Sequence, residues 1–132
     1  MDISLIKARN EDKEFLLFLR KSTMVPHLEK ADLYLSDEEH ISRVEIYFDK
    51  SFVISYQEEN IGLLKYIETE KIMTILQIQI LLQYQGKGIA SYILNQLITK
   101  AKKLEKEIHL KVLKENPARY LYERLGFNTI CD

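Results

Sequence analysis

The segment Ile80-Leu81-Leu82-Gln83-Tyr84-Gln85-Gly86-Lys87-Gly88-Ile89-Ala90 decides the fold of this 132-residue chain. An apolar run rich in β-branched residues over 72–82 predicts a long strand, and it ends in a turn with two glycines. A helix is predicted directly afterwards, from 86 to about 104, because its apolar residues recur at four-residue spacing: Ile89, Ile93, Leu97 and Ala101. Backbone N–H groups at such a helix start, with the helix dipole, form a site for phosphate oxygens.

The composition of the turn supports a phosphate site. Gly86 and Gly88 lack the Cβ atoms that would keep a pyrophosphate away from the backbone, and Ala90 keeps the first helical turn small. The segment has neither the Gly-x-Gly-x-x-Gly nor the Gly-x-x-x-x-Gly-Lys-Ser/Thr motif, which sets those two nucleotide-binding classes aside. Ordinary turn chemistry is the alternative explanation of the two glycines.

The residues before this segment predict two helices between a first strand and a hairpin. Residues 3–6 alternate as a strand, and Asn10 is a candidate cap for a helix with Phe15, Phe18 and Leu19 on its apolar face. Residues 24–35, with Pro26, are predicted to be irregular. The capping box Ser36…Glu39 begins a second helix, with Ile41, Val44 and Phe48 on one face. Strands at 51–56 and 61–67, joined by a polar turn at 58–60, predict the hairpin.

The residues after the central helix complete a mixed α/β sheet. A strand is predicted at 108–113, and Asn116 is the candidate cap of a short helix with Pro117 at its first position. Gly126 is expected to end that helix, and residues 127–131 to form a last strand. The predicted order is β-α-α-β-β-β-α-β-α-β in a single domain over 1–132.

Composition and charge exclude several classes of protein. A net charge of −1 argues against a general nucleic-acid binder, and one cysteine leaves too few thiols for a disulfide framework or a cysteine-based metal site. No apolar run approaches the roughly 20 residues that span a bilayer, and no signal-peptide pattern is present, so no membrane partner and a cytoplasmic location are expected. Residues 1–86 carry 10 Lys and Arg against 15 Asp and Glu, whereas 87–132 carry 9 against 5. The acidic first part favours a cationic ligand and the basic second part an anionic ligand. The alternative is that the charges of both parts only contact solvent.

Two motifs together resemble the GNAT superfamily of N-acetyltransferases. Gln85-x-x-Gly88-x-Ala90 is similar to that family's Gln/Arg-x-x-Gly-x-Gly/Ala signature, after the fourth strand and at the start of the third helix. The second signature is Asn116-Pro117-Ala118 followed by residues 121–127, and a helix and a strand separate the two, as in the family. The order of elements matches over essentially the whole chain. The family's final strand is expected to be missing, because the chain stops six residues after Gly126.

The resemblance implies acetyl-CoA as the acetyl donor and assigns residues to it. Backbone groups of the strand before the turn would pair with the pantetheine arm, with an N–H group nearest the acetyl carbonyl, where it would stabilise developing negative charge. The helix start would bind the pyrophosphate, and Asn116 the cofactor arm, unless it only caps its helix. The implied cofactor-binding residues are Ile78, Gln79, Ile80, Gln85, Gly86, Lys87, Gly88, Ile89, Ala90, Ser91 and Asn116. No metal is implied.

Tyr122 matches the family's usual general acid. A phenol with a pKa near ~10 can protonate the leaving thiolate, and the alternative is a core aromatic at helical spacing from Ala118 and Leu125. The base that deprotonates the amine is unassigned, because the expected acidic residue is replaced by Gln77 and Gln79 on one strand and by Lys111 on the next. The remaining candidates are His27, for which a surface position is the alternative, and, more weakly, Glu29, Tyr34 and Glu68.

The sequence therefore predicts an N-acetyltransferase that acts on a primary amine of a small molecule or peptide. The alternative is a non-catalytic acyl-CoA-binding sensor or regulatory module, which the missing base favours and Tyr122 disfavours. The acidic first 86 residues favour a cationic acceptor. Without the final strand, the strand at 108–113 is expected to have an open edge, which would either favour a homodimer, with Cys131 near the contact, or lower stability.

Overall fold

The computed structural model describes residues 1–112 and 119–131 and, within them, all side chains except those at 27, 112, 119–121 and 129–131. The predicted order of strands and α-helices is confirmed, with three short 3-10 turns added. The strands form a six-stranded sheet in the order β1-β2-β3-β4-β5-β6. The chain divides into two compact units: unit 1 is Met1–Lys65 with Ile78–Lys87, and unit 2 is Tyr66–Gln77 with Gly88–Asp132.

In unit 1, three antiparallel strands form one end of the sheet. β1 (Ile3–Lys7) pairs with β2 (Ser51–Tyr56), which pairs with β3 (Glu59–Glu68). The β2–β3 turn consists of Gln57 and Glu58, with φ of 51° and 68°. Two successive left-handed residues match the twist of the flanking strands. The turn therefore precedes the predicted position at 58–60, because strand pairing already resumes at Glu59, opposite Tyr56.

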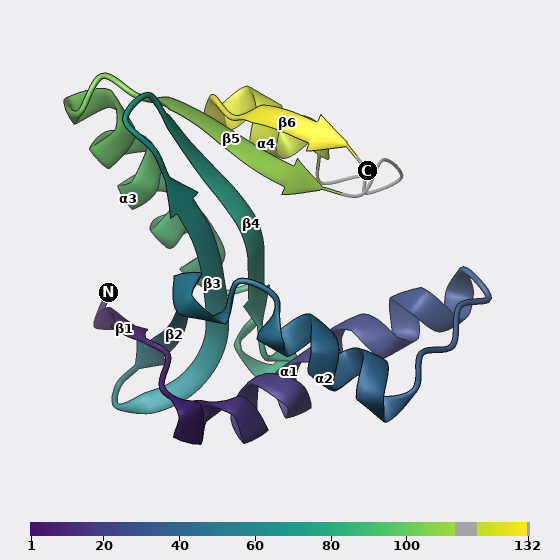
Figure 1. Ribbon diagram of the computed structural model, residues 1–132. Helices are drawn as coiled ribbons and strands as arrows, with labels where there is room; N and C mark the ends of the chain where they lie inside the picture. Colours follow the sequence, from purple (N-terminus) through teal and green to yellow (C-terminus); the bar gives the residue numbers. More distant parts are fainter. Residues whose placement is uncertain (113–118, 132) are drawn as a thin grey trace. The chain divides into compact units, whose positions relative to one another are not determined.

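Two helices of unit 1, α1 (Lys13–Lys30) and α2 (Asp37–Glu45), lie side by side (Figure 1). The irregular stretch predicted at 24–35 is wrong in its first part, since α1 continues through Pro26 to Lys30. A proline costs a helix about 3 kcal/mol, so tertiary packing has overridden local propensity here. The capping box of α2 is confirmed: Ser36 Oγ accepts a hydrogen bond from the N–H of Glu39 at 3.1 Å.

The start and the buried face of α1 also differ from prediction. Asn10 is not a cap but the first residue of a 3-10 turn (Asn10–Asp12), and Asp12 accepts a hydrogen bond from the N–H of Arg9 at 2.8 Å. Phe18 is 60% exposed, whereas Leu16 and Leu19 are fully buried. This helix has more apolar residues than positions on its buried face, so the spacing of apolar residues does not by itself show which of them are buried.

The core of unit 1 joins both helices to the sheet and to the end of β4 (Ile72–Ile80), whose last three residues belong to this unit. Burial of each large apolar side chain contributes about 1.5–3 kcal/mol. Gly62 of β3 lies so close to β4 that an added Cβ would be within 2.4 Å of the Gln79 carbonyl oxygen, closer than any side chain permits. The cluster consists of Ala8, Leu16, Leu19, Val44, Val53, Leu63 and Leu81.

Unit 2 contains two parallel strand pairs and two helices. β4 pairs with β5 (Glu107–Val112) from Ile72 opposite Glu107 to Ile75 opposite Leu110. The helix α3 (Ile89–Lys103) buries the four predicted apolar residues and also Leu94 and Ile98. After α4 (Arg119–Leu125), Gly126 has φ 108° and its N–H donates to the Glu123 carbonyl at 3.1 Å, so it ends the helix as predicted.

The prediction of an open edge on the fifth strand is wrong. β6 (Asn128–Cys131) pairs with β5 in parallel, from His109 opposite Asn128 to Val112 opposite Cys131, and lies along it in Figure 1. The left-handed Gly126 turns the chain back at the end of α4, which brings the following residues alongside β5. Because β6 occupies this edge of β5, the edge is not open for pairing with a second copy of the chain.

Among the described residues, no helix is long and apolar enough to cross a membrane. The same residues contain no group of three or more His, Cys, Asp and Glu side chains that could hold a metal ion.

Candidate active site

In unit 1, the turn after β4 is closed by the side chain of Gln85. Its Nε2 donates to the carbonyl oxygen of Ile80, the last residue of the strand, at 2.8 Å. Leu81 is fixed in turn by a hydrogen bond from its N–H to the Ile61 carbonyl at 2.8 Å. Gly86 follows with φ 75°, and an added Cβ there would meet nothing within 4 Å. The backbone conformation, rather than crowding within the protein, therefore favours glycine at this position.

In unit 2, the helix α3 begins without a capping side chain. Gly88 is its N-cap in the left-handed conformation (φ 79°, ψ 12°), and its carbonyl accepts the N–H of Tyr92 at 3.0 Å. Among the side chains that the structure describes, none bonds to the first N–H groups, and the first turn contains no acidic residue. Amides at Ile89, Ala90 and Ser91 thus lie at the positive end of the helix dipole without a side-chain partner. Such a helix start is suited to binding an anion.

The end of β4 carries one unsatisfied polar atom. Ile80 is buried, while Ile78 and Gln79 are half-buried. The Oε1 atom of Gln79 is buried and has no hydrogen-bond partner among the described residues. Such an unpaired acceptor costs about 1–3 kcal/mol, so a donor supplied by a ligand would recover that energy.

Tyr122 lies on α4 in unit 2, with its ring half-buried. The ring packs edge-to-face on Phe127, with centroids 6.4 Å apart and planes at 81°. The backbone holds the pair together, because the N–H of Phe127 donates to the Tyr122 carbonyl at 3.1 Å. Burial raises the pKa of the Tyr122 phenol, so the hydroxyl keeps its proton at neutral pH. This is the state that a general acid requires.

The structure does not support a general base among the remaining predicted residues that it describes. Asn116 lies outside the described residues, as does the side chain of His27. Glu68 is a poor base, since it binds Lys106 at 2.5 Å and Lys100 at 3.3 Å, and chiefly the hydrogen bond from Lys106 lowers its pKa. Tyr34 is 71% exposed and Glu29 is also exposed.

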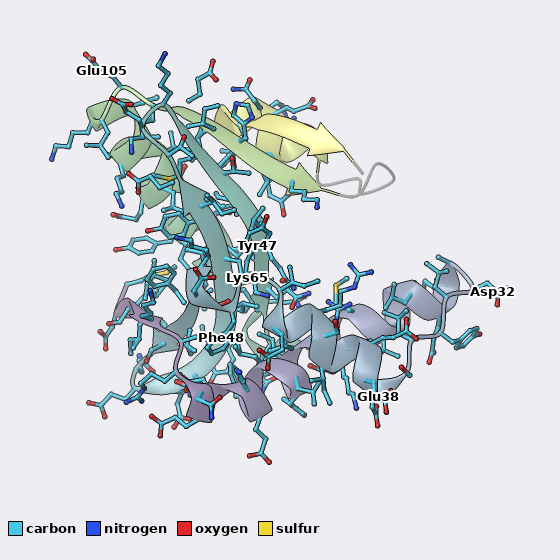
Figure 2. The ribbon with its side chains drawn as sticks, in the orientation of Figure 1. Asp32, Glu38, Tyr47, Phe48, Lys65 and Glu105 are labelled. Carbon is cyan, nitrogen blue, oxygen red and sulfur yellow. The ribbon has the colours of Figure 1, made fainter. Side chains whose placement is uncertain are left out.

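A cationic cluster in unit 1 was missed in the sequence. Lys65 of β3 is only 4% exposed, and its Nζ donates to the carbonyl oxygens of Arg43 at 3.1 Å, Val44 at 3.3 Å and Ile46 at 2.7 Å (Figure 2). It therefore satisfies the otherwise unpaired C-terminal carbonyls of α2. The sequence signal for this buried residue is the presence of one lysine within the otherwise apolar run at 61–67.

A buried pair of helix residues belongs to the same cluster. Nε of Arg20 on α1 donates to Nδ1 of His40 on α2 at 3.1 Å, and the two residues are 9% and 3% exposed. Because Nδ1 accepts this bond, His40 is neutral, and burial lowers its pKa. Neither residue forms part of a recognised motif, and only the packing of α1 on α2 brings them together.

The burial of Lys65 makes a prediction about stability at alkaline pH. Burial, followed by the charge of Arg20, lowers the pKa of Lys65 to about 8, from 10.5 in an unfolded chain. Between these values the unfolded chain holds a proton that the folded chain has lost, so stability rises with pH. The test quantity is the difference between the free energies of unfolding of wild type and of Lys65→Met. We expect this difference to increase by up to about 3 kcal/mol from pH 8 to pH 10.5.

Urea unfolding at several pH values measures this difference, and effects of the other ionisable groups cancel because both proteins share them. Lys50→Met removes an exposed lysine and should follow the wild-type slope. Parallel curves for wild type and Lys65→Met would contradict the predicted effect.

The fold and the helix start together define a class of protein: a mixed α/β domain in which a strand runs through a glycine turn into a helix open to an anion. Comparison with known proteins identifies the family within this class. A model described as an acetyltransferase (GNAT) domain matches residues 48–129. A curated relative, the [ribosomal protein bS18]-alanine N-acetyltransferase of Haemophilus influenzae, is 41% identical over 58 residues, 43% of this chain. That match spans only 40% of the relative's length.

Solved structures show the same fold. The acetyltransferase of Thermus thermophilus has a TM-score of 0.72 at 15% identity, covering 96% of this chain and 86% of its own. Arabidopsis thaliana Naa50, solved with the bisubstrate analogue CoA-Ac-MVNAL, has a TM-score of 0.66 at 19% identity, covering 96% and 83%. The family match covers well over half of the chain, which therefore belongs to the GNAT acetyltransferase family.

Proposed function

We propose that this chain is an N-acetyltransferase that moves the acetyl group of acetyl-CoA to a primary amine of a small molecule or peptide. The observation that carries the proposal is the start of α3, where amides without a side-chain cap follow two left-handed glycines. These amides fit a pyrophosphate in both charge and access. Membership of the GNAT acetyltransferase family supports the same chemistry.

In this proposal the chain holds acetyl-CoA along β4 and at the start of α3. The backbone of Ile78–Ile80 binds the pantetheine arm, and the N–H groups of Gly86–Ser91 bind the pyrophosphate. Gln85 shapes the turn through its bond to the Ile80 carbonyl, and Lys87, which is exposed, adds positive charge. Asn116 binds the cofactor arm. The unsatisfied Oε1 of Gln79 is an acceptor for an amide N–H of that arm.

Acetyl transfer then needs a donor to the carbonyl oxygen and a proton for the leaving sulfur. The N–H of Ile80 stabilises the negative charge that develops on the oxygen as the amine attacks. Tyr122 donates its phenolic proton to the thiolate as the carbon–sulfur bond breaks. The protonated amine loses one proton to solvent before it attacks, and the second proton that leaves its nitrogen as the amide forms restores the Tyr122 phenol. The rate should therefore rise as the pH approaches the pKa of the amine.

The relatives support an amine on a peptide as one class of acceptor. The Haemophilus relative is named for an alanine of a ribosomal protein, and the Arabidopsis structure contains a CoA–peptide bisubstrate analogue. We therefore place peptide N-termini beside small primary amines in the test of function.

The test is release of free CoA from acetyl-CoA with a panel of amino acids, peptides, polyamines and aminoglycosides. We expect amine-dependent release with at least one class. A protein that binds acetyl-CoA but releases no CoA with any of them would instead be the acyl-CoA-binding sensor that is the alternative. A protein without any response to acetyl-CoA would contradict both functions.

A further inference from the structure

The guanidinium of Arg20 is buried and forms no ion pair with a carboxylate of the described residues. Arg20 is 9% exposed, and its Nε donates to Nδ1 of His40, a neutral acceptor. Within the described part of the chain, its terminal nitrogens make no hydrogen bond or ion pair. A guanidinium has five N–H donors in a planar fork, so most of its donors remain available.

The charges around Arg20 are of the same sign. The positive charge of Arg20 is one cause of the lowered pKa of Lys65. The pKa of Arg20 is itself lowered, first by burial and then by the positive charge of Arg43. The Nζ of Lys65 already donates three hydrogen bonds to the end of α2, so Lys65 has no donor left for a ligand and contributes only its positive charge to the surroundings of Arg20. Arg43 lies on the surface in the last turn of α2. Concentrated positive charge of this kind attracts an anion.

The carboxylates of the two helices that could neutralise this charge have other partners. Asp37 pairs with Lys21 at 2.5 Å, and Glu45 pairs with Lys13 at 2.9 Å. Glu39 accepts the N–H and the hydroxyl of Ser36 in the capping box. None of these three carboxylates bonds to Arg20, so its terminal nitrogens can bind the anionic group of a ligand.

We propose that Arg20, with Arg43 beside it, binds a carboxylate of the acceptor, so that the acceptor carries both an amine and a carboxylate. This inference rests on the proposed acetyl transfer. The guanidinium fork matches the two oxygens of a carboxylate, which gives short, charge-assisted bonds. Leu19, next to Arg20, packs in the same cluster as Leu81 at the end of β4, so the anion site and the donor strand belong to one unit.

The experiment compares matched pairs of acceptors: amino acids and short peptides against the same compounds with the carboxylate replaced by a carboxamide. Each pair has the same amine-bearing chain and differs in one negative charge. In wild type, we expect kcat/KM to be about 10- to 100-fold higher for the acid than for the amide, the range that hydrogen bonds to a charged group provide. Inorganic phosphate is added as a competitor in a separate arm.

Three variants locate the effect. Arg20→Gln should remove the preference for the acid without changing the melting response to acetyl-CoA, and Arg43→Gln should reduce it. Arg43 is exposed, so this second variant keeps the test available if Arg20→Gln does not fold. Lys21→Gln is the matched control, since Lys21 lies on the same helix beside Arg20 but pairs with Asp37; it should keep the preference.

Equal rates for acids and amides in wild type would overturn the inference, as would a full preference in folded Arg20→Gln. Phosphate is tested at saturating acetyl-CoA, which occupies the anion site at the start of α3; equal inhibition of acid and amide acceptors under that condition would overturn the assignment of Arg20 to the acceptor. Failure of the proposed function is distinguishable, because acetyl-CoA would then fail to raise the melting temperature or release CoA with any amine.

Discussion

Tyr122→Phe should lower the turnover of acetyl transfer about 100-fold while acetyl-CoA still binds. The phenylalanine ring preserves the edge-to-face packing on Phe127, so the change removes only the hydroxyl. Because burial raises the pKa of this phenol above its ordinary value, wild type should lose activity only at a pH higher than an exposed tyrosine would require, and the variant should lack that decline. Steady-state rates across pH, together with melting in the presence of acetyl-CoA, measure both effects.

A matched control separates chemistry from packing. Tyr56 also packs edge-to-face on an aromatic ring, that of Tyr84, with centroids 6.1 Å apart. Tyr56→Phe should therefore keep the wild-type rate. If Tyr122→Phe turns over an identified substrate as fast as wild type does, Tyr122 is a packing residue and the general acid lies elsewhere.

Gly88→Val should abolish the stabilisation of the protein by acetyl-CoA. In wild type, ligand at 100 times its dissociation constant adds about 2.7 kcal/mol to the free energy of unfolding. Valine places a branched side chain at the start of α3 and resists the φ of 79° that Gly88 adopts, at a cost of roughly 1–2 kcal/mol. The amides of the first turn are then screened from a pyrophosphate, and the melting temperature should no longer respond to ligand.

The loss of response is informative only if the variant folds, which its far-UV spectrum and a cooperative melt establish. Lys87→Gln is the companion control, because it removes a neighbouring charge but leaves the glycines; it should retain most of the shift. A Gly88→Val protein that melts higher with millimolar acetyl-CoA, as wild type does, would mean that the start of α3 is not the phosphate site.

Sequence patterns identified the second half of the fold well because its signals are local. The four apolar residues of α3 repeat at helical spacing, and all four are buried. The glycines at 86, 88 and 126 stand where the backbone adopts positive φ, which other residues rarely do. Capping at Ser36 is equally local, since both partners lie within four residues.

Other predictions failed where long-range contacts outweighed local preference. Residues 24–35, with Pro26, were expected to be irregular, but α1 continues through Pro26 to Lys30 and packs against α2. Phe18 was assigned to the buried face but is exposed. The assignment failed because the presence of an apolar residue in a helix does not reveal which face of the helix meets the core. The edge of β5 was expected to be open, yet β6 covers it through a pairing between residues about 20 positions apart.

The sequence by itself determined the strand–turn–helix junction and the order of elements, since these depend on residue type and spacing along a few turns of chain. Only the tertiary structure brought Arg20 of α1, His40 of α2 and Lys65 of β3 into one cluster. Those residues are separated by about 20 to 45 positions, and nothing in their spacing couples them. The charges of Arg20 and Lys65 interact because helix packing on the sheet removes the water that would otherwise screen them.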